Sequence, residues 1–241
     1  MTRAGRALVL LASVVALAPA DAVHAGTVTP LQVRTYYIAA DEVVWNSAPN
    51  GRNLTGTPRL ENEGASQPTV YRKAIYREYT DATSSTLKPR RPQWEHLGIL
   101  GPLIRAQVGD TVKVVFKNNT KIFASLHPHG LAYDKNSEGA VYSDGIPPDK
   151  KTGDNVASGQ VYTYTWKVPQ RAGPGPGDPS SILWAYHSHF VEPRDMNTGL
   201  FGPIIVSAKG STKPDGTPQG VDREFIVAFG GTRTPQPAPA V

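Results

Sequence analysis

The sequence predicts an all-β protein with a Greek-key β-sandwich or barrel. Apolar residues alternate with a period of two rather than recurring every 3.6 residues, which is the pattern of strands with one buried face. The chain also holds 23 glycines and 22 prolines, and turn signals such as Gly109-Asp110 and Asn118-Asn119 separate the alternating runs. About eight short strands with this punctuation are typical of a single sandwich domain.

Eight segments carry the strand pattern in chain order. They cover residues 31–39, 69–80, 103–108, 111–117, 125–129, 160–168, 182–187 and 200–207. In the sixth segment, Tyr162, Tyr164 and Trp166 share one face. Thr163 and Thr165 share the opposite face, so we expect the aromatic side to be buried and the threonine side to be wet. No pattern is long enough to predict a dominant helix.

The two ends of the chain have different compositions. Two arginines, an apolar run over residues 7–18 and the small-residue site Val23-His24-Ala25 predict a signal peptide at residues 1–25. An uncleaved membrane anchor is the alternative, although the run is short for a membrane span. The mature domain is then residues 26–209, and residues 210–241 are predicted to be a linker, one possible strand at 222–229 and a proline-rich tail. We expect disordered tails and a secreted, extracellular protein.

Charge and cysteine content exclude several classes of function. The net charge is +5, with basic residues interspersed among acidic ones, so a nucleic-acid partner is not indicated. No segment after the signal peptide has the character of a membrane span. The chain has no cysteine, so it can form neither disulfides nor a metal–thiolate bond.

Four of the six histidines fall into two His-x-His pairs, which indicate a metal site. The pairs are His127-Pro128-His129 and His187-Ser188-His189. On a strand, residues i and i+2 project from the same face, so each pair directs two imidazoles at one place. Imidazole binds zinc, copper, iron and nickel, and composition does not choose between these metals.

The remaining histidines and the flanking residues limit the alternatives. His96 is unpaired and is expected to be an ordinary hydrogen-bonded residue, and His24 lies at the edge of the signal peptide. Metallo-β-lactamase-like zinc sites use His-x-His followed closely by Asp-His, which follows neither pair here. A mononuclear zinc or copper enzyme that uses three of the four histidines stays open.

Five motifs resemble the first domain of multicopper oxidases. They are GILGPLIRAQVGD at 98–110, LHPHG at 126–130, EGAVY at 138–142, YHSH at 186–189 and GLFGPII at 199–205. The closest likeness is to the branch of ceruloplasmin, hephaestin and the coagulation factor A domains, and it covers roughly residues 33–209. It implies a cupredoxin fold, copper as cofactor and half of a trinuclear copper cluster. Such clusters reduce dioxygen with electrons from a reducing substrate.

The resemblance also assigns roles to single residues. It implies that His127 binds the type 2 copper, while His129, His187 and His189 bind the paired type 3 coppers. Asp144 resembles the acid that family members place near the type 2 copper, where it orients water and relays protons. An ordinary aspartate of a β-turn is the alternative for Asp144.

Three further residues match the family pattern less closely. Tyr133 resembles a tyrosine that follows the first motif, but we expect it to be a core residue. Asp154 and Asn155 align loosely with a calcium-binding stretch, although a site so poor in carboxylates binds calcium weakly.

The residues that are missing imply an incomplete oxidase. A full cluster in this family uses eight histidines, whereas this chain offers four. A type 1 copper needs His-Cys-His and a further histidine, and here Ser188 and Pro193 occupy those positions. We therefore expect a copper-dependent oxidoreductase that requires a second cupredoxin domain or chain carrying a type 1 copper. Assembly of several copies of this chain into a homo-oligomer is a further alternative. The alternative is a non-catalytic copper-binding or interaction domain.

Overall fold

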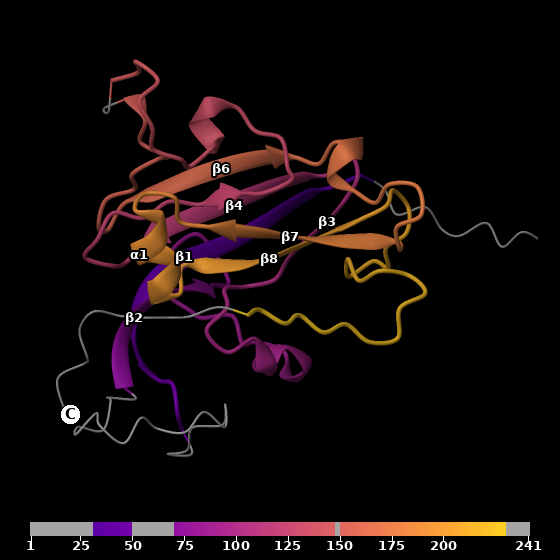
Figure 1. The fold of residues 1–241 in the computed structure, drawn as a ribbon, viewed down its shortest axis with the longest axis horizontal. Helices are drawn as coiled ribbons and strands as arrows, with labels where there is room; N and C mark the ends of the chain where they lie inside the picture. The colour runs from indigo at the N-terminus through magenta and orange to yellow at the C-terminus, as the bar shows by residue number, and fades with distance from the viewer. Residues whose placement is uncertain (1–30, 50–69, 148–149, 230–241) are drawn as a thin grey trace, which may run out of the picture.

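Two four-stranded β-sheets pack face to face in the computed structural model, which describes residues 31–49, 70–147 and 150–229 (Figure 1). The predicted signal peptide at 1–25 and the proline-rich end of the chain at 230–241 lie outside the described residues. Among the described residues, no helix combines the length and the apolar character that a membrane crossing requires.

The first sheet has the strand order β2-β1-β4-β6. Its strands are β1 (Val33–Asn46), β2 (Val70–Glu78), β4 (Thr111–Asn118) and β6 (Val161–Lys167). Strand β1 is antiparallel to β2 and parallel to β4, while β4 is antiparallel to β6. This mixture of parallel and antiparallel neighbours arises because the chain crosses between the sheets, as in a Greek key.

The second sheet has the strand order β3-β8-β7-β5. Its strands are β3 (Ile104–Gln107), β5 (His127–Pro128), β7 (Ser181–His187) and β8 (Phe201–Ser207). Strand β3 is parallel to β8, and the β8–β7 and β7–β5 pairs are antiparallel. The all-β sandwich predicted from the sequence is confirmed, with β1 longer and β5 shorter than expected.

Aromatic side chains from both sheets fill the core. Tyr164 and Trp166 of β6 are fully buried while Thr163 is exposed, which confirms the predicted alternation. Buried phenol groups need hydrogen-bond partners. Tyr76 donates to the backbone carbonyl of Ser125 at 2.6 Å, and this bond joins β2 to the segment that leads into β5.

Helical segments are short. Those that lie wholly in the described residues are the 3-10 helices η1 (Pro92–Leu97), η2 (Lys135–Ser137) and η4 (Gln170–Ala172) and the α-helix α1 (Glu192–Thr198). Helix α1 ends at Gly199, whose φ of 118° lies in the left-handed region. A Cβ atom there would lie 2.8 Å from the side chain of Ile75, so glycine also permits the close approach of β2.

The predicted strand at residues 222–229 does not form. Within the described residues, no backbone pairing joins this segment to either sheet. It is held instead by side chains: Ile226 is buried in a cluster with Leu97, Leu100 and Ile205, and Glu224 pairs with Arg105. Glu224 and Ile226 thus attach this segment to the domain, whereas Phe225, Val227 and Phe229 are exposed. The division of the chain at residue 209 stays a prediction.

Candidate metal centre

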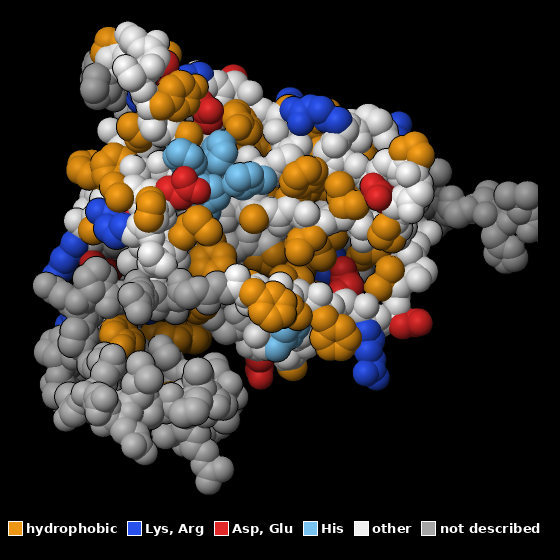
Figure 2. Space-filling view, viewed as in Figure 1, with side chains coloured by type: hydrophobic (Ala, Val, Ile, Leu, Met, Phe, Trp, Pro, Cys, Tyr) orange, Lys and Arg blue, Asp and Glu red, His pale blue; other side chains and the backbone are white. Residues whose placement is uncertain are grey.

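The four histidines of the two His-x-His pairs lie together at one end of the second sheet. His127 in β5 and His187 in β7 are direct register partners, and His129 and His189 lie two residues beyond each. The ring centroids of the contacting pairs lie between 5.0 and 5.6 Å apart. Figure 2 shows these imidazoles gathered in one surface patch, with one other histidine lying apart. Two stretches that are distant in the sequence thus contribute to one group.

His129 and His187 face each other most closely. Their Nε2 atoms lie 2.9 Å apart, and their rings are nearly parallel at 26°. Two nitrogens that bind one ion at about 2.0 Å each lie about 2.8 Å apart at a bond angle of about 90° and about 3.3 Å apart at the tetrahedral angle. These two imidazoles are therefore placed to hold one ion together, with little movement of either side chain.

Backbone carbonyl groups fix which ring nitrogen faces the cluster. The Nδ1 atom of His127 lies 2.7 Å from the carbonyl oxygen of Glu138, and that of His187 lies 3.1 Å from the carbonyl oxygen of Ser188. A carbonyl oxygen only accepts hydrogen bonds, so Nδ1 carries the proton and Nε2 keeps its lone pair. This is the tautomer in which Nε2 can bind a metal ion.

Burial lowers the pKa of two of these histidines below the ordinary value of 6.5. Desolvation is the largest cause for both His127 and His187, and the nearby imidazoles lower the pKa further. The hydrogen bonds to the Glu138 and Ser188 carbonyl groups act in the opposite direction but are weaker. Both rings are therefore neutral at neutral pH and able to bind a cation.

The lowered pKa values predict that the metal-free chain loses stability as the pH falls below 6.5. In the unfolded chain His127 takes up a proton near its ordinary pKa of 6.5, whereas the folded chain binds that proton only at lower pH. The unfolded state then holds more protons, so the free energy of unfolding decreases on acidification. Urea denaturation between about pH 7.5 and 5.5 measures this loss. A His127→Gln variant should lose less over the same range, and an equal loss would show that His127 is not involved.

A carboxylate that the sequence analysis missed also faces the cluster. Glu192, at the start of α1, places its carboxylate 3.7 Å from Nε2 of His189 and 4.0 Å from Nε2 of His187. The available signal was its position three residues after His189, but the short helix that brings it back was not predicted. Its negative charge favours a cation at the open side of the imidazoles.

A buried hydrogen-bond network ties the two pairs to each other. The Ser188 hydroxyl donates to the Asp195 carboxylate at 2.7 Å and accepts from the backbone N–H of Ser125 at 3.1 Å. The Ser125 hydroxyl accepts from the backbone N–H of His189 at 3.0 Å and donates to the Gly139 carbonyl group at 2.6 Å. Ser188, between two candidate ligands, therefore has a structural role in joining β7, α1 and the segment before β5.

Asp144 contacts lysines rather than the histidines. Its carboxylate pairs with Lys151, lies 3.8 Å from the Lys135 ammonium group and accepts from the backbone N–H of Ile146 at 3.0 Å. The hydrogen bond from Lys151 is the main reason that the pKa of Asp144 is lowered. None of the contacts recorded for Asp144 in the described part of the chain is to a histidine, so its proton-relay role stays a prediction.

Three other sequence expectations can be compared with the structure. Tyr133 is 36% exposed, with its ring 5.6 Å from that of His127, so the expectation of a core tyrosine is wrong. Asp154 is buried against the Lys135 ammonium group at 2.7 Å, where a cation already neutralises it. His96 is exposed and its Nδ1 atom lies 2.8 Å from the carbonyl oxygen of Gln93, which is the ordinary environment expected for it.

The histidine group is open on one side. His187 is buried, but His129 is exposed and the His189 side chain is 35% exposed. Among the described residues, no three or more His, Asp or Glu side chains form a finished metal-binding group.

Comparison with known proteins connects this geometry to a family. A profile described as multicopper oxidase matches residues 95–211, which include all four clustered histidines. The human ferroxidase HEPHL1 is 42% identical over 215 residues, covering 85% of this chain and 18% of that protein. Human ceruloplasmin is 39% identical over 210 residues, which cover 81% of this chain and 20% of ceruloplasmin. Coagulation factor V of Sus scrofa is 38% identical over 196 residues, which cover 81% of this chain and 8% of factor V. The chain thus spans a fifth or less of the length of these relatives.

Proposed function

Because this chain belongs to the multicopper oxidase family and has its cupredoxin type of sandwich, we propose that it supplies half of a trinuclear copper centre for dioxygen reduction. The observation that carries this proposal is the convergence of four imidazoles from β5 and β7 on one open patch. A half-centre needs its metal-facing nitrogens at the surface, where a second set of ligands can approach.

The donor set fits copper. Copper(II) is the tightest of the common divalent first-row ions at nitrogen sites, and neutral imidazole is a suitable ligand. The Nε2 separation of 2.9 Å supports a single type 3 copper shared by His129 and His187. His189 would then bind the second type 3 copper and His127 the type 2 copper. When bound, copper supplies the one-electron redox steps that dioxygen reduction requires.

The protein's own groups position these ligands. The Glu138 carbonyl group holds the His127 ring by its Nδ1 atom, and the Ser188–Ser125 contact keeps the two pairs at a fixed separation. Glu192 places a negative charge beside His187 and His189, which reduces the electrostatic cost of gathering several cations. Asp144 is proposed to relay protons only after Lys151 releases it, because that lysine now holds its carboxylate.

The other half of the centre has to come from elsewhere. The four histidines are half of the eight in a full cluster, and the chain has no cysteine for a type 1 copper. The partner is proposed to be a second cupredoxin domain or chain that carries four histidines and a type 1 copper. A homo-oligomer is the competing arrangement, since two copies would also bring eight histidines together. The reducing substrate is selected in the partner, near the type 1 copper.

The proposed location is outside the cell, by way of the predicted signal peptide at residues 1–25. Analysis of the mature N-terminus of the exported protein tests this proposal. Cleavage after Ala25 would support it, and a retained N-terminus would favour the membrane anchor.

The isolated chain is expected to bind copper without catalysing oxidation. We would load the purified chain with copper, remove the excess, and measure copper per chain together with oxygen consumption in the presence of Fe(II) or a phenol. The expected result is retained copper, no intense blue absorption and no turnover, because no thiolate ligand or second half-centre is present. A His96→Ala variant should retain as much copper as the parent chain. Absence of copper binding, or sustained turnover by the chain alone, would contradict the proposal.

A further inference from the structure

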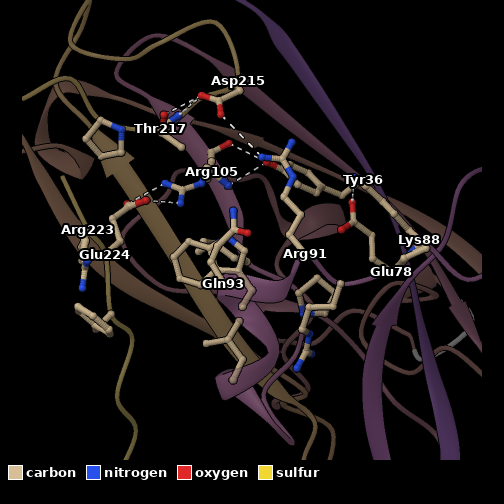
Figure 3. Close-up of a pocket in the computed structure, with 18 of the residues that line it drawn as sticks. Tyr36, Glu78, Lys88, Arg91, Gln93, Arg105, Asp215, Thr217, Arg223 and Glu224 are labelled. Atoms are coloured by element: carbon tan, nitrogen blue, oxygen red, sulfur yellow. Dashed lines mark hydrogen bonds and ion pairs between the residues drawn. The ribbon is translucent and has the colours of Figure 1, made fainter. Parts of the chain in front are cut away.

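A second hollow lies away from the histidine patch, between η1 and the C-terminal segment. Its volume is about 940 Å³, and we call it the η1 cleft. Residues of η1, the segment before it, β3 and the stretch 213–225 line this cleft, including Arg90, Arg91, Trp94, Arg105, Asp215 and Glu224 (Figure 3). A hollow of this size is in the usual range for small organic ligands.

The lining of the η1 cleft carries more positive than negative charge. It includes seven lysines or arginines and four aspartates or glutamates. One of these cations, Arg77, is neutralised by Asp41 outside the lining at 2.7 Å, so the lining keeps a positive excess. A concave surface with charge of one sign concentrates ions of the other sign. The cleft therefore favours an anion.

Arg91 is the cation best placed to meet a ligand. Its side chain is 65% exposed, and among the described residues it forms one ion pair, with Asp215 at 3.8 Å, which Figure 3 shows across the cleft. The same Asp215 carboxylate accepts two closer hydrogen bonds from Thr217, at 3.0 and 2.7 Å. An exposed pair at this distance is weak, whereas a bidentate bond between arginine and a carboxylate is strong. A bound carboxylate can thus replace Asp215 at Arg91 at little cost.

Arg90 adds a charge that no carboxylate offsets. Its guanidinium group donates to the carbonyl groups of Gly98 at 2.9 Å and Leu100 at 2.7 Å, and no ion pair is recorded for it within the described residues. Arg90 is exposed, and desolvation by its surroundings is the largest cause that lowers the pKa of its guanidinium group. An anion in the cleft would supply a counter-charge.

The remaining walls are apolar and fixed. The Arg105 guanidinium group lies over the Trp94 ring at 5.4 Å and binds Glu224 through two hydrogen bonds of 2.9 and 2.5 Å. Arg105 is thereby engaged on both sides, and it holds the C-terminal segment in place as a wall of the cleft. Leu97 and Leu103 complete the apolar lining, which suits a carbon skeleton better than a bare inorganic ion.

We propose that the η1 cleft binds a small organic polycarboxylate, with Arg91 as its main contact and Arg90 as a second positive charge in the lining. The Trp94 side of the cleft packs against the carbon skeleton of the ligand. This binding is independent of the copper function, because none of the four clustered histidines lines the cleft.

Calorimetric titration of the metal-free chain with tricarballylate tests the proposal. This probe carries three carboxylates, and the Arg91→Gln variant should weaken its binding at least about tenfold, because a bidentate charged contact is lost. Arg72→Gln removes another exposed arginine, in β2, that does not line the cleft, and it should leave the affinity unchanged. Arg91 makes no side-chain cap to η1, so the variant is expected to fold.

Three outcomes would overturn this assignment. They are no binding of tricarballylate to the parent chain, equal losses in the Arg72 and Arg91 variants, and inorganic phosphate binding as tightly as tricarballylate. The titration is repeated in the His127→Ala variant, which should bind the probe as the parent chain does. This control separates the proposed copper function from the proposed binding of a polycarboxylate. If copper binding fails, the tricarballylate affinity of the η1 cleft is still expected to be unchanged.

Discussion

Replacing His187 with alanine should remove most of the copper-binding capacity of the chain. His187 contacts the other three clustered imidazoles, and its Nε2 atom is the nearest to that of His129. Removing groups that only orient a metal ligand typically costs about 10- to 100-fold in affinity, so losing a ligand itself should cost at least about 100-fold. Competition with a calibrated copper chelator measures the change.

The matched control for this variant is His96→Ala. His96 is exposed and hydrogen-bonded to the Gln93 carbonyl group, outside the cluster. Its replacement should change neither copper content nor affinity. Equal losses in the two variants would show that copper binds histidines at random, and unchanged affinity in the His187 variant would remove His187 from the ligand set. Urea denaturation of both metal-free variants checks that each is folded.

Replacing Asp195 with alanine should destabilise the domain by about 3 kcal/mol, since buried hydrogen-bond donors lose their partner. Asp195 has no exposed surface, and its carboxylate accepts from the Ser188 hydroxyl, the Val191 backbone N–H and Arg194. The variant leaves a buried hydroxyl and an N–H group unsatisfied. Because Ser188 lies between His187 and His189, we expect weaker copper binding as well.

Chemical denaturation with Glu95→Ala as the control measures this effect. Glu95 is an exposed carboxylate of η1, and surface substitutions of this kind usually change stability by less than about 0.5 kcal/mol. A loss for the Asp195 variant no larger than for the Glu95 variant would contradict a structural role of the network. An Asp195→Asn variant, which keeps one acceptor oxygen, should lie between the two.

The strands could be predicted because the alternation of apolar and polar residues within each strand shows which of its faces is buried. Alternation in β6 places Tyr164 and Trp166 inside, and this pattern depends only on residues that are close in the sequence. The segment 222–229 shows the limit of that signal, since its pattern also suits a strand but the segment pairs with neither sheet. Whether an alternating segment pairs with another strand depends on which strands lie beside it in the fold, and the local sequence does not show this.

The candidate metal centre was predictable in part for the same reason. The spacing within each His-x-His pair puts two imidazoles on one face, but the meeting of the pairs depends on β5 lying beside β7. Glu192 and the Ser188–Asp195 contact were missed because a short helix after β7 brings them back to the site. Arg91 and Asp215 are 124 positions apart, so the η1 cleft has no local signature at all.

The β5 strand is only two residues long, yet it sets the direction of half of the imidazoles. It pairs His127 with His187 and the buried Pro128 with Tyr186. Since strand side chains alternate between faces, sliding β5 by a single position would turn the proline outward and drive both imidazoles of its motif into the aromatic interior. The length of the loop before β5 can therefore be changed only if the pairing of His127 with His187 and of Pro128 with Tyr186 is preserved.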